Sequence, residues 1–373
     1  MTTSRYYLIK MGIRELPRLL YCGVAQRNSS FISRIPFRPL TLSFNITDNC
    51  NSRCITCNQW KHKSTDELTT EEVEDILVQA KNLGIRSIGF AGGEPLLRKD
   101  LPRIIRMARD IKFESTHITT NGLLLTEEKA ISLIESGLRR FSISIDGLQE
   151  IHDVIRGIPG GFQRSINAVK TLTDLRDYRY SDLEINIGTT LMKPTLFEIP
   201  KIVELSKELG VTCGFNLIDA STYFFKGVDM SGLWLDEADW DKLDELINEL
   251  HTTKLENRGL IGTSHASLEY MRHYFKDPKR KDIPCCLGYL NIYVGPHGDV
   301  YSGCWSLPPM GNLREDKLDA IVNSDEYKHR LKNMFLKNCP GCSCNYPTNL
   351  WYHVPSLFNE LKWQTKGKLI WKR

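Results

Sequence analysis

The sequence predicts an α/β fold built around a parallel sheet, followed by a smaller C-terminal α+β unit that is rich in cysteine. Three observations lead to this expectation. From residue 40 onward, six short β-branched or apolar runs alternate with five longer amphipathic stretches. Glycine follows three of these stretches, at Gly84, Gly137 and Gly210, where a left-handed helix C-cap favours it. After residue 284 the pattern changes to a hairpin signal flanked by cysteines.

The regular part of the chain contains strands and helices in strict alternation. The expected strands are 40–47, 86–91, 116–120, 140–146, 183–191 and 211–217. The expected helices are 69–83, 98–112, 126–136, 162–177 and 194–209. Strands linked by helices make right-handed crossovers and hence a parallel sheet. Periodicity leaves open whether this sheet is flat and doubly wound or curled into a partial or full barrel, but in each case function gathers at the carboxyl ends of the strands.

The second half of the chain is less regular. Helices are expected at 236–251, 264–275 and 324–336, and a Gly-Pro-His-Gly-Asp turn at 295–299 indicates a β-hairpin. A charged linker at 277–282 precedes the hairpin. We therefore divide the chain into a basic N-terminal extension (1–37), an α/β core (38–217), a helical linker region (218–284), an auxiliary cysteine-rich domain (285–346) and a basic tail (347–373).

Composition restricts the compartment and the partners. The 373 residues include eleven cysteines and carry a formal net charge of +4, which is too small to imply nucleic-acid binding. No apolar run approaches the roughly 18 residues that span a bilayer. Charged residues interrupt the first 20 positions, so a secretory signal is not expected. An odd cysteine count in a long chain fits a reducing cytoplasm and metal-bound thiolates better than a disulfide framework.

Both ends of the chain are basic. Residues 1–40 carry seven Lys or Arg and one Glu, and residues 361–373 carry five Lys or Arg and no acid. Aromatic residues accompany these charges at both ends. Two interpretations stay open: the ends are solvated, or they are attracted to an anionic surface in a weak peripheral membrane contact.

Three cysteines, Cys50, Cys54 and Cys57, follow the first expected strand with C-x3-C-x2-C spacing. A loop this short can place three thiolates on three corners of an iron–sulfur cube. Such clusters usually have four cysteine ligands, so a triad leaves one iron open to another molecule. The alternative is a zinc site, but structural zinc sites are normally closed, and His62 is the only nearby candidate for a fourth ligand.

This loop resembles the signature of the radical S-adenosylmethionine (radical SAM) superfamily, over residues 38–217. The resemblance implies a partial (β/α)6 TIM-like barrel with a [4Fe–4S] cluster on Cys50, Cys54 and Cys57. It also implies that the open iron binds S-adenosylmethionine (AdoMet), whose reductive cleavage gives a 5′-deoxyadenosyl radical that abstracts hydrogen from a substrate. An electron donor such as flavodoxin or ferredoxin would supply electrons to the cluster.

The segment Gly92-Gly93-Glu94-Pro95 follows the second expected strand. Two glycines let the backbone pass close to a ligand, and a carboxylate accepts hydrogen bonds from an ammonium group. Alone, the segment is an ordinary strand–helix turn. Beside the cysteine triad it resembles the family's GGEP motif, which implies that it binds the methionine amino group.

Polar residues also end the third and fourth expected strands. Asn121 follows the third, while Ser142, Ser144 and Asp146 alternate along the fourth and share the face that would line a barrel interior. Buried polar groups need partners. The ribose and carboxylate of AdoMet would supply them, and so would an internal hydrogen-bond network.

Two further elements extend the resemblance. The segment 152–157 resembles the H-D-x-I-R-G segment of family members with a C-terminal SPASM or twitch cluster domain. Its Arg156 could clamp the methionine carboxylate in a bidentate contact, or form a surface ion pair. Asn186 on the fifth strand is a candidate ribose contact, as in relatives, and Gly188 beside it suggests a close approach by a ligand.

The C-terminal cysteines could hold a second metal site. Cys286 and Cys304 flank the expected hairpin, and Cys339 and Cys342 form a C-x2-C pair. This pattern resembles a twitch domain, a shortened SPASM domain, with one auxiliary [4Fe–4S] cluster. A zinc ribbon is the alternative. Two further cysteines compete for these positions: Cys285 for that of Cys286, and Cys344 for that of Cys339 or Cys342.

The expected function is therefore a radical SAM oxidoreductase or maturase that acts on a small-molecule or peptide substrate. The auxiliary cluster would accept an electron from the substrate radical. No residue in the sequence identifies the substrate or the catalytic acid or base. The alternative is a non-catalytic scaffold that binds zinc or a cluster, although such a scaffold needs no AdoMet-binding motifs.

Overall fold

The computed structural model describes residues 17–18, 20–25, 27–35, 37, 39–62, 64–218, 227–278, 284–339 and 362–363. Within them, the strands form one sheet in the order β6-β5-β4-β3-β2-β1-β7-β8. The strands are β1 (Thr41–Asn45), β2 (Ser87–Ala91), β3 (Ser115–Thr120), β4 (Arg140–Ser144), β5 (Glu184–Leu191), β6 (Thr212–Leu217), β7 (Asn291–Val294) and β8 (Val300–Tyr301). Strands β1 to β6 are parallel to their neighbours, and the sheet ends at β6 and β8 without closing.

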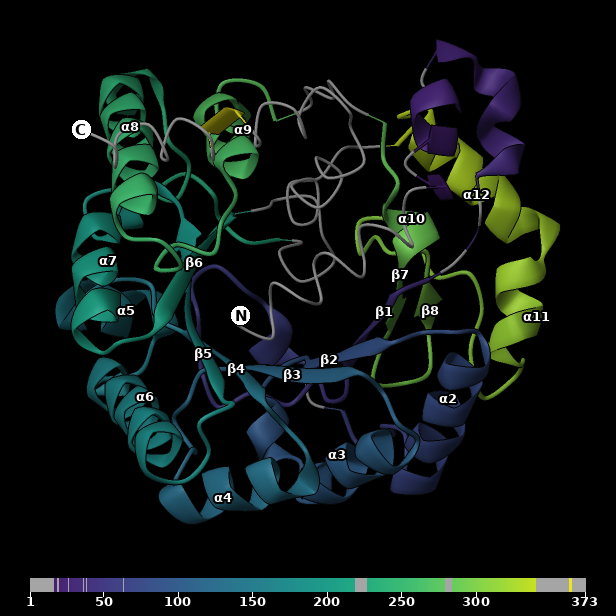
Figure 1. The fold of residues 1–373 in the computed structure, drawn as a ribbon, viewed down its shortest axis with the longest axis horizontal. Helices are drawn as coiled ribbons and strands as arrows, with labels where there is room; N and C mark the ends of the chain where they lie inside the picture. Colours follow the sequence, from purple (N-terminus) through teal and green to yellow (C-terminus); the bar gives the residue numbers. More distant parts are fainter. Residues whose placement is uncertain are drawn as a thin grey trace.

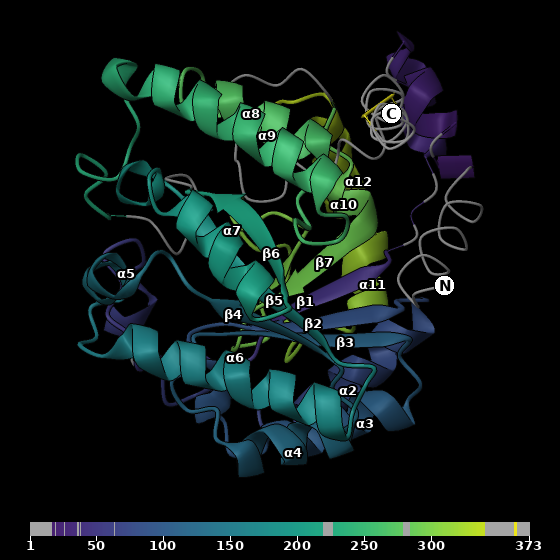
Figure 2. The ribbon, with the colours of Figure 1, turned by 60° about the vertical axis from the view of Figure 1, so that its left-hand side comes forward.

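The helices pack mainly on the outside of this curved sheet (Figures 1 and 2). The longer helices are α2 (Thr70–Asn82), α3 (Leu101–Asp110), α4 (Glu127–Ser136), α5 (Gln149–Arg156), α6 (Gly161–Tyr178), α7 (Ile199–Glu208), α8 (Trp240–Glu256), α9 (His265–Tyr274) and α12 (Asp325–Phe335). Two shorter helices are α10 (Leu287–Leu290) and α11 (Leu318–Asn323). The expected α/β partial barrel is confirmed.

Local sequence explains where the helices begin and end. Thr69 and Glu72 form a reciprocal capping box at the start of α2, as the sequence indicates. Gly84, Gly137 and Gly210 follow their helices with positive φ angles of 87°, 121° and 62°. Glycine adopts these angles at little cost, so each helix can stop and turn toward the next strand.

Burial alternates along the strands and sets the barrel's two faces. In β4, Phe141 and Ile143 are buried against the helices, whereas Ser142 and Ser144 on the other face are partly exposed. Strand β5 repeats this pattern, with Asn186, Gly188 and Thr190 partly exposed. The inner face of the sheet therefore carries small and polar side chains that solvent reaches, and the apolar core lies between sheet and helices.

The expected C-terminal hairpin is present, and it joins the sheet of the α/β core. Strand β7 pairs in parallel with β1, and β8 pairs antiparallel with β7. The backbone N–H of Leu40 donates to the carbonyl of Leu290 at 2.6 Å, which extends the contact beyond the strands. Strands β1 and β7, which are far apart in the sequence, thus lie side by side (Figure 1). Helices α5, α10 and α11 were not expected from the sequence.

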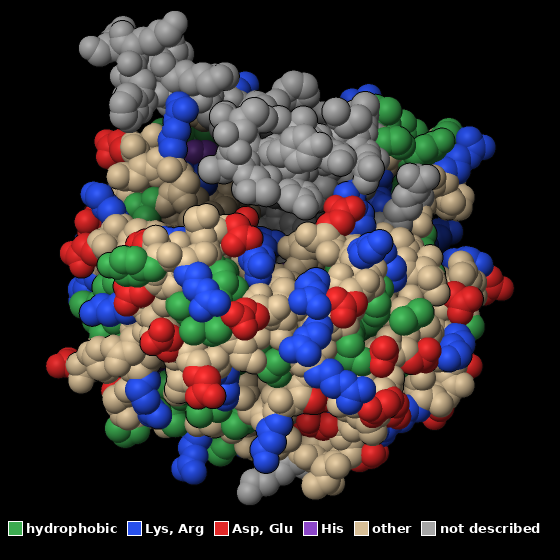
Figure 3. Space-filling model, turned by 60° about the horizontal axis from the view of Figure 1, so that its bottom comes forward, with side chains coloured by type: hydrophobic (Ala, Val, Ile, Leu, Met, Phe, Trp, Pro, Cys, Tyr) green, Lys and Arg blue, Asp and Glu red, His purple; other side chains and the backbone are tan. Residues whose placement is uncertain are grey.

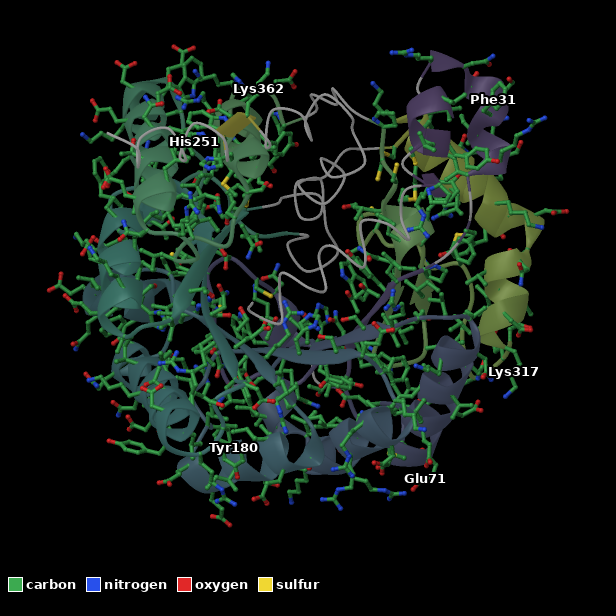
Figure 4. All side chains as sticks on the ribbon, in the orientation of Figure 1. Phe31, Glu71, Tyr180, His251, Lys317 and Lys362 are labelled. Atoms are coloured by element: carbon green, nitrogen blue, oxygen red, sulfur yellow. The ribbon has the colours of Figure 1, made fainter. Side chains whose placement is uncertain are left out.

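Aromatic residues near both ends pack onto the rest of the chain. Phe37 meets Tyr327 of α12 edge to face, with ring centroids 5.7 Å apart. Phe31 lies on the N-terminal segment beside α12 (Figure 4) and packs against the core. Trp363 stacks on His251 of α8 and His265 of α9, at 4.5 and 4.9 Å. These three aromatic rings are therefore not simply solvated.

The surface over α3 and α4 mixes acidic and basic side chains without a large patch of one sign (Figure 3). Among the helices that the structure describes, none combines the length and apolar character that crossing a membrane requires.

Candidate active site

The cysteine loop after β1 is packed directly on the loop after β2. The N–H of Gly93 donates to Thr47 O at 2.7 Å, and the N–H of Glu94 donates to Asn49 O at 2.8 Å. A Cβ added at Gly93 would lie 2.2 Å from Asn49 O, so only glycine fits there. The two glycines of the GGEP segment thus let its backbone lie directly against the loop that carries Cys50. Pro95 begins a single 3-10 turn, η3 (Pro95–Leu97).

Helix α5 supports the cysteine loop from the other side. Arg53 N donates to Arg156 O, and Ile55 N donates to Ile155 O, both at 2.9 Å. Gly157 ends the helix at φ 63°, and a Cβ there would lie 2.5 Å from Arg53 O. The H-D-x-I-R-G segment therefore holds the three-cysteine loop in place, a role that its sequence alone did not reveal.

Glu94 is buried at the carboxyl ends of β2 and β3, with 1% of its surface exposed. Its carboxylate accepts hydrogen bonds from Thr120 Oγ1 at 2.6 Å, Asn121 N at 2.8 Å and Leu96 N at 3.0 Å. Burial raises the pKa of this carboxyl, although the hydrogen bonds and the Arg156 charge oppose the shift. A carboxylate offers about four acceptor positions, so Glu94 retains capacity for one more donor.

The side chain of Asn121 reaches the cysteine loop. Its Nδ2 donates to Asn51 Oδ1 at 2.8 Å and to Ser52 Oγ at 2.9 Å. Glu94 and Asn121 therefore connect the ends of β2 and β3 to the segment between Cys50 and Cys54. Asn121 is 8% exposed, so any contact with a ligand would come from one edge of its amide.

Arg156 joins the cysteine loop to the end of β4. Its Nη2 lies 2.6 Å from Asp146 Oδ2, and its Nη1 lies 3.9 Å from Cys54 Sγ. Asp146 is 2% exposed, and its other oxygen accepts from Thr190 N at 2.9 Å. Asp146 and Cys54 raise the pKa of Arg156, against the effect of burial, so the guanidinium stays charged. The ion pair is thus internal rather than on the surface, and a carboxylate clamp by Arg156 stays a prediction.

The polar residues of β4 and β5 partly satisfy one another. Asn186 Nδ2 donates to Ser142 Oγ at 3.1 Å, and Thr212 Oγ1 donates to Asn186 Oδ1 at 3.1 Å. Ser142 therefore belongs to an internal network, one of its two expected roles. Ser144 lies on the same partly exposed inner face, and Gly188 opens the space beside Ser142. The ribose contacts expected of Ser144 and Asn186 stay predictions.

The three thiols of the loop fit an iron–sulfur cluster chemically. Burial raises the pKa of Cys50 to about 12 and that of Cys57 to about 11, so without metal these groups are protonated thiols. The N–H groups of Ser52 and Gln59 donate to the sulfurs of Cys50 and Cys57, each at 3.4 Å. Iron binding displaces thiol protons, and hydrogen bonds to sulfur stabilise the thiolates that result.

Cys285, Cys286 and Cys304 lie at the open end of the β7–β8 hairpin. Cys286 directly precedes α10, and Cys304 follows β8; they are 1% and 6% exposed. Cys304 packs with Leu287 and Met334, and Cys285 lies against the same group. Cys339 is partly buried after α12, whereas Cys342 and its competitor Cys344 lie outside the described residues.

The structure adds a connection that sequence reasoning missed. His297, in the β7–β8 turn, has its Nε2 3.1 Å from Asp48 Oδ2 and its Nδ1 2.9 Å from Asp66 O. Asp48 stands two residues before Cys50. The hairpin next to the auxiliary cysteines therefore also touches the first cysteine loop. A histidine in a Gly-Pro-His-Gly turn carries no local signal for a contact 249 residues away in sequence.

Comparison with known proteins agrees with this arrangement. Residues 44–205 match the model of the radical SAM superfamily, and residues 285–345 match an iron–sulfur cluster-binding domain, SPASM. An AdoMet-dependent heme synthase of Oleidesulfovibrio alaskensis is 32% identical over 77% of this chain and 75% of its own length. A protein of the same description from Methanosarcina barkeri is 29% identical over 82% of this chain and 91% of its own length.

The fold is also shared with solved structures. Native anSMEcpe with bound AdoMet superposes with a TM-score of 0.64 at 20% identity, covering 89% of this chain and all of that one. SuiB of Streptococcus suis bound to its precursor peptide SuiA gives 0.62 at 19% identity, covering 80% of this chain and 68% of that one. AdoMet and a [4Fe–4S] cluster are the cofactors that the matched domain implies, and SPASM implies auxiliary iron–sulfur clusters. The chain is an enzyme that belongs to the radical SAM superfamily and carries a C-terminal SPASM domain.

Proposed function

We propose that this enzyme cleaves AdoMet reductively at the Cys50–Cys54–Cys57 loop and abstracts hydrogen from a substrate held over the inner face of the sheet. The proposal rests on one observation, that the groups expected to bind the cluster and AdoMet lie together at one edge of the sheet. The cysteine loop, buried Glu94 and the Arg156–Asp146 pair meet at the carboxyl ends of β1, β2 and β4. When bound, the cluster supplies the electron that converts AdoMet to methionine and the 5′-deoxyadenosyl radical.

The chain's own groups would orient AdoMet. Glu94 supplies a buried acceptor for the ammonium, on a loop whose shape Gly92, Gly93 and Pro95 fix. Arg156 keeps a positive charge beside Cys54, where it can balance thiolate charge and attract a carboxylate. Two or more of the polar residues on the inner face of the sheet and at the ends of its strands would contact the ribose. These residues are Asn121, Ser144, Asp146 and Asn186.

The auxiliary domain, residues 285–346, would hold its cluster on Cys286, Cys304, Cys339 and Cys342 and accept the substrate's electron. For the other four segments we propose the bounds that the sequence indicates, namely 1–37, 38–217, 218–284 and 347–373. Replacing both Cys286 and Cys304 with alanine should leave 5′-deoxyadenosine formation intact while oxidised product fails to accumulate. Normal turnover to product in this double variant would refute the electron-acceptor role.

Iron porphyrins are the substrate class that we propose to test first. Two heme synthases and an Fe-coproporphyrin III synthase each match at least 77% of this chain. A third heme synthase matches 45% of it, about as much as the PqqA peptide cyclase of Bradyrhizobium diazoefficiens, which matches 46%. Anaerobic enzyme, AdoMet, dithionite and Fe-coproporphyrin III should give more 5′-deoxyadenosine than enzyme without porphyrin. If the porphyrin neither increases 5′-deoxyadenosine formation nor shows a shift of its absorption band, porphyrins are refuted as the substrate class. Peptides and other small molecules would then be tested.

We place the reaction in the cytoplasm, with flavodoxin or ferredoxin as electron donor. A weak membrane contact would use Leu20, Tyr21 and Val24, which are 61%, 40% and 46% exposed near the basic N-terminus. Sedimentation with phosphatidylglycerol vesicles at low salt, reversed at high salt, would support this contact because such attraction is screened. Binding that does not occur, or that ignores salt, would refute it.

A further inference from the structure

Cys22, in the N-terminal extension, lies against one of the proposed auxiliary ligands. Its sulfur is 3.4 Å from the sulfur of Cys286, although 264 positions separate the two residues in sequence. Cys22 is fully buried and Cys286 is 1% exposed. From the sequence Cys22 is expected to be an ordinary buried thiol. It is buried, but in a place where its S–H group can act on the auxiliary centre.

Arg18 brings a buried positive charge to the same point. It is 2% exposed and lies one helical turn before Cys22, so the two side chains share a face of the helical residues 17–18 and 20–25. Without metal, the contact with Cys22 and burial raise the pKa of Cys286, whereas the positive charge of Arg18 opposes this rise. A hydrogen-bonding thiol and a guanidinium therefore act on Cys286 from the same helical segment.

The N-terminal extension is fixed against the auxiliary domain at several further points. The 3-10 helix η1 (Ser29–Arg34) packs on α12, and Phe37 packs on Tyr327 of the same helix. Figure 1 shows the N-terminal turns beside α10 and α12, away from the outer barrel helices. The contact between Cys22 and Cys286 is therefore part of an extended interface rather than an isolated approach of two side chains.

Iron binding fixes the direction of the sulfur–sulfur contact. A cysteine that binds iron has lost its proton, so bound Cys286 can only accept a hydrogen bond, and the Cys22 S–H group must donate it. The distance of 3.4 Å is within the range of a hydrogen bond between sulfur atoms. Cys22 keeps its proton and is not a ligand, so Cys286, Cys304, Cys339 and Cys342 remain the four cysteines of the proposed cluster.

Both groups favour the reduced form of that cluster. Reduction adds a negative charge, which hydrogen bonds to the ligand sulfurs and nearby positive charge stabilise. We propose that the Cys22 S–H group and the Arg18 guanidinium raise the reduction potential of the auxiliary cluster, which suits it to accept an electron from the substrate. Both are positioning residues that act through Cys286. The inference rests on the proposed auxiliary cluster and on Cys286 as one of its ligands.

The test uses full-length chains under anaerobic conditions. Arg18→Gln removes the charge and Arg18→Lys keeps it, whereas Cys22→Ala removes the donor and Cys22→Ser keeps one. Cys213→Ala is the control, because Cys213 is also fully buried but lies in β6, at the opposite end of the sheet from the β7–β8 hairpin. Each change is made in the wild type and in a parent chain whose three β1-loop cysteines are alanine, where the auxiliary cluster remains alone.

The measurements are iron per chain, circular dichroism and a redox titration followed by electron paramagnetic resonance. We expect each variant to keep the iron of its parent. Arg18→Gln should make reduction of the auxiliary cluster about tenfold less favourable, a fall of about 59 mV in the midpoint potential for one electron. Cys22→Ala should lower the potential by less, because a thiol is a weak donor. Arg18→Lys, Cys22→Ser and Cys213→Ala should stay close to the parent value.

A parent-like potential in Arg18→Gln or in Cys22→Ala would refute the role of that residue. If one of these two variants does not fold, the other decides. A folded Cys22→Ala chain without auxiliary iron would overturn the proposal, because Cys22 would then be needed to hold the cluster. So would a Cys22→Ser chain whose potential falls as far as that of Cys22→Ala, because the serine hydroxyl still donates.

The result can be separated from the proposed function. A parent chain that binds no iron would refute the auxiliary cluster itself, and this inference with it. Normal product formation in the Cys286 and Cys304 double variant would refute only the electron-acceptor role. The potentials are measured without substrate, so the effect of Cys22 and Arg18 on the cluster would stand.

Discussion

Replacing Glu94 with glutamine removes one buried negative charge while keeping the shape of the side chain. In the structure one carboxylate oxygen accepts from Thr120 and Leu96, and the other accepts from the N–H of Asn121 at 2.8 Å. Glutamine keeps one acceptor oxygen and turns the other into a donor, so the Asn121 N–H loses its partner. A buried donor left unpaired costs about 1–3 kcal/mol, which is the expected fall in the free energy of unfolding.

The same substitution should weaken AdoMet binding. A hydrogen bond to a charged group contributes about 1.5–3 kcal/mol, so affinity should fall roughly ten- to a hundredfold. Anaerobic isothermal titration calorimetry measures this affinity, and urea unfolding measures stability. Glu71→Gln removes an exposed carboxylate of α2 and is the matched control. Thr120→Val removes one hydrogen bond to Glu94 but keeps the charge, so it should reduce affinity less.

The two effects of Glu94→Gln can be separated. If stability falls as expected but AdoMet affinity stays within about twofold of wild type, Glu94 holds the strand ends together and does not bind the ligand. If neither quantity changes, the burial and the hydrogen bonds assigned to Glu94 are wrong.

Three further changes have defined outcomes. Alanine at all three cysteines of the β1 loop should remove about half of the iron and abolish 5′-deoxyadenosine formation; unchanged iron would place the first cluster elsewhere. Gly157→Ala should lower stability by at least about 1–2 kcal/mol in urea unfolding, because φ is 63° and the new Cβ meets Arg53 O; wild-type stability would contradict this packing. Burial and nearby positive charges lower the pKa of His265 to about 4. Neutral His265 therefore makes its full contribution to the free energy of unfolding above about pH 6.5, and this contribution is lost as the pH falls toward 4. The fluorescence of Trp363, isolated by subtracting Trp363→Phe, should change over that range, and a flat profile would refute the coupling.

Much of the fold could be predicted because its signals are local. Strands with alternating or continuous apolar residues, the Thr69 capping box and the C-cap glycines are each set by a few neighbouring residues. Helix α5 was not predicted because it is only eight residues long, Gln149–Arg156. A short helix held by contacts with another loop has little periodicity of its own.

The site was predictable in its members but not in their partners. The spacing of the three cysteines and the GGEP segment identified the loops that meet. Nothing local indicated that Arg156 would pair with Asp146, or that His297 would reach Asp48. Such contacts depend on how remote strands register in the sheet, and single-sequence patterns carry no information about that register.

The pairing of β1 with β7 has a consequence for synthesis of the chain. Strand β1 is made early, but its partner on one side, Asn291–Val294, leaves the ribosome only after the whole barrel segment has been translated. Until then β1 presents an unpaired edge, a feature that promotes aggregation. Nascent chains that stop before residue 291 should therefore need chaperones more than the finished chain does. The cysteine loop that follows β1 is likewise attached to a strand paired on both sides only when translation is almost complete, so the iron–sulfur cluster should be inserted late.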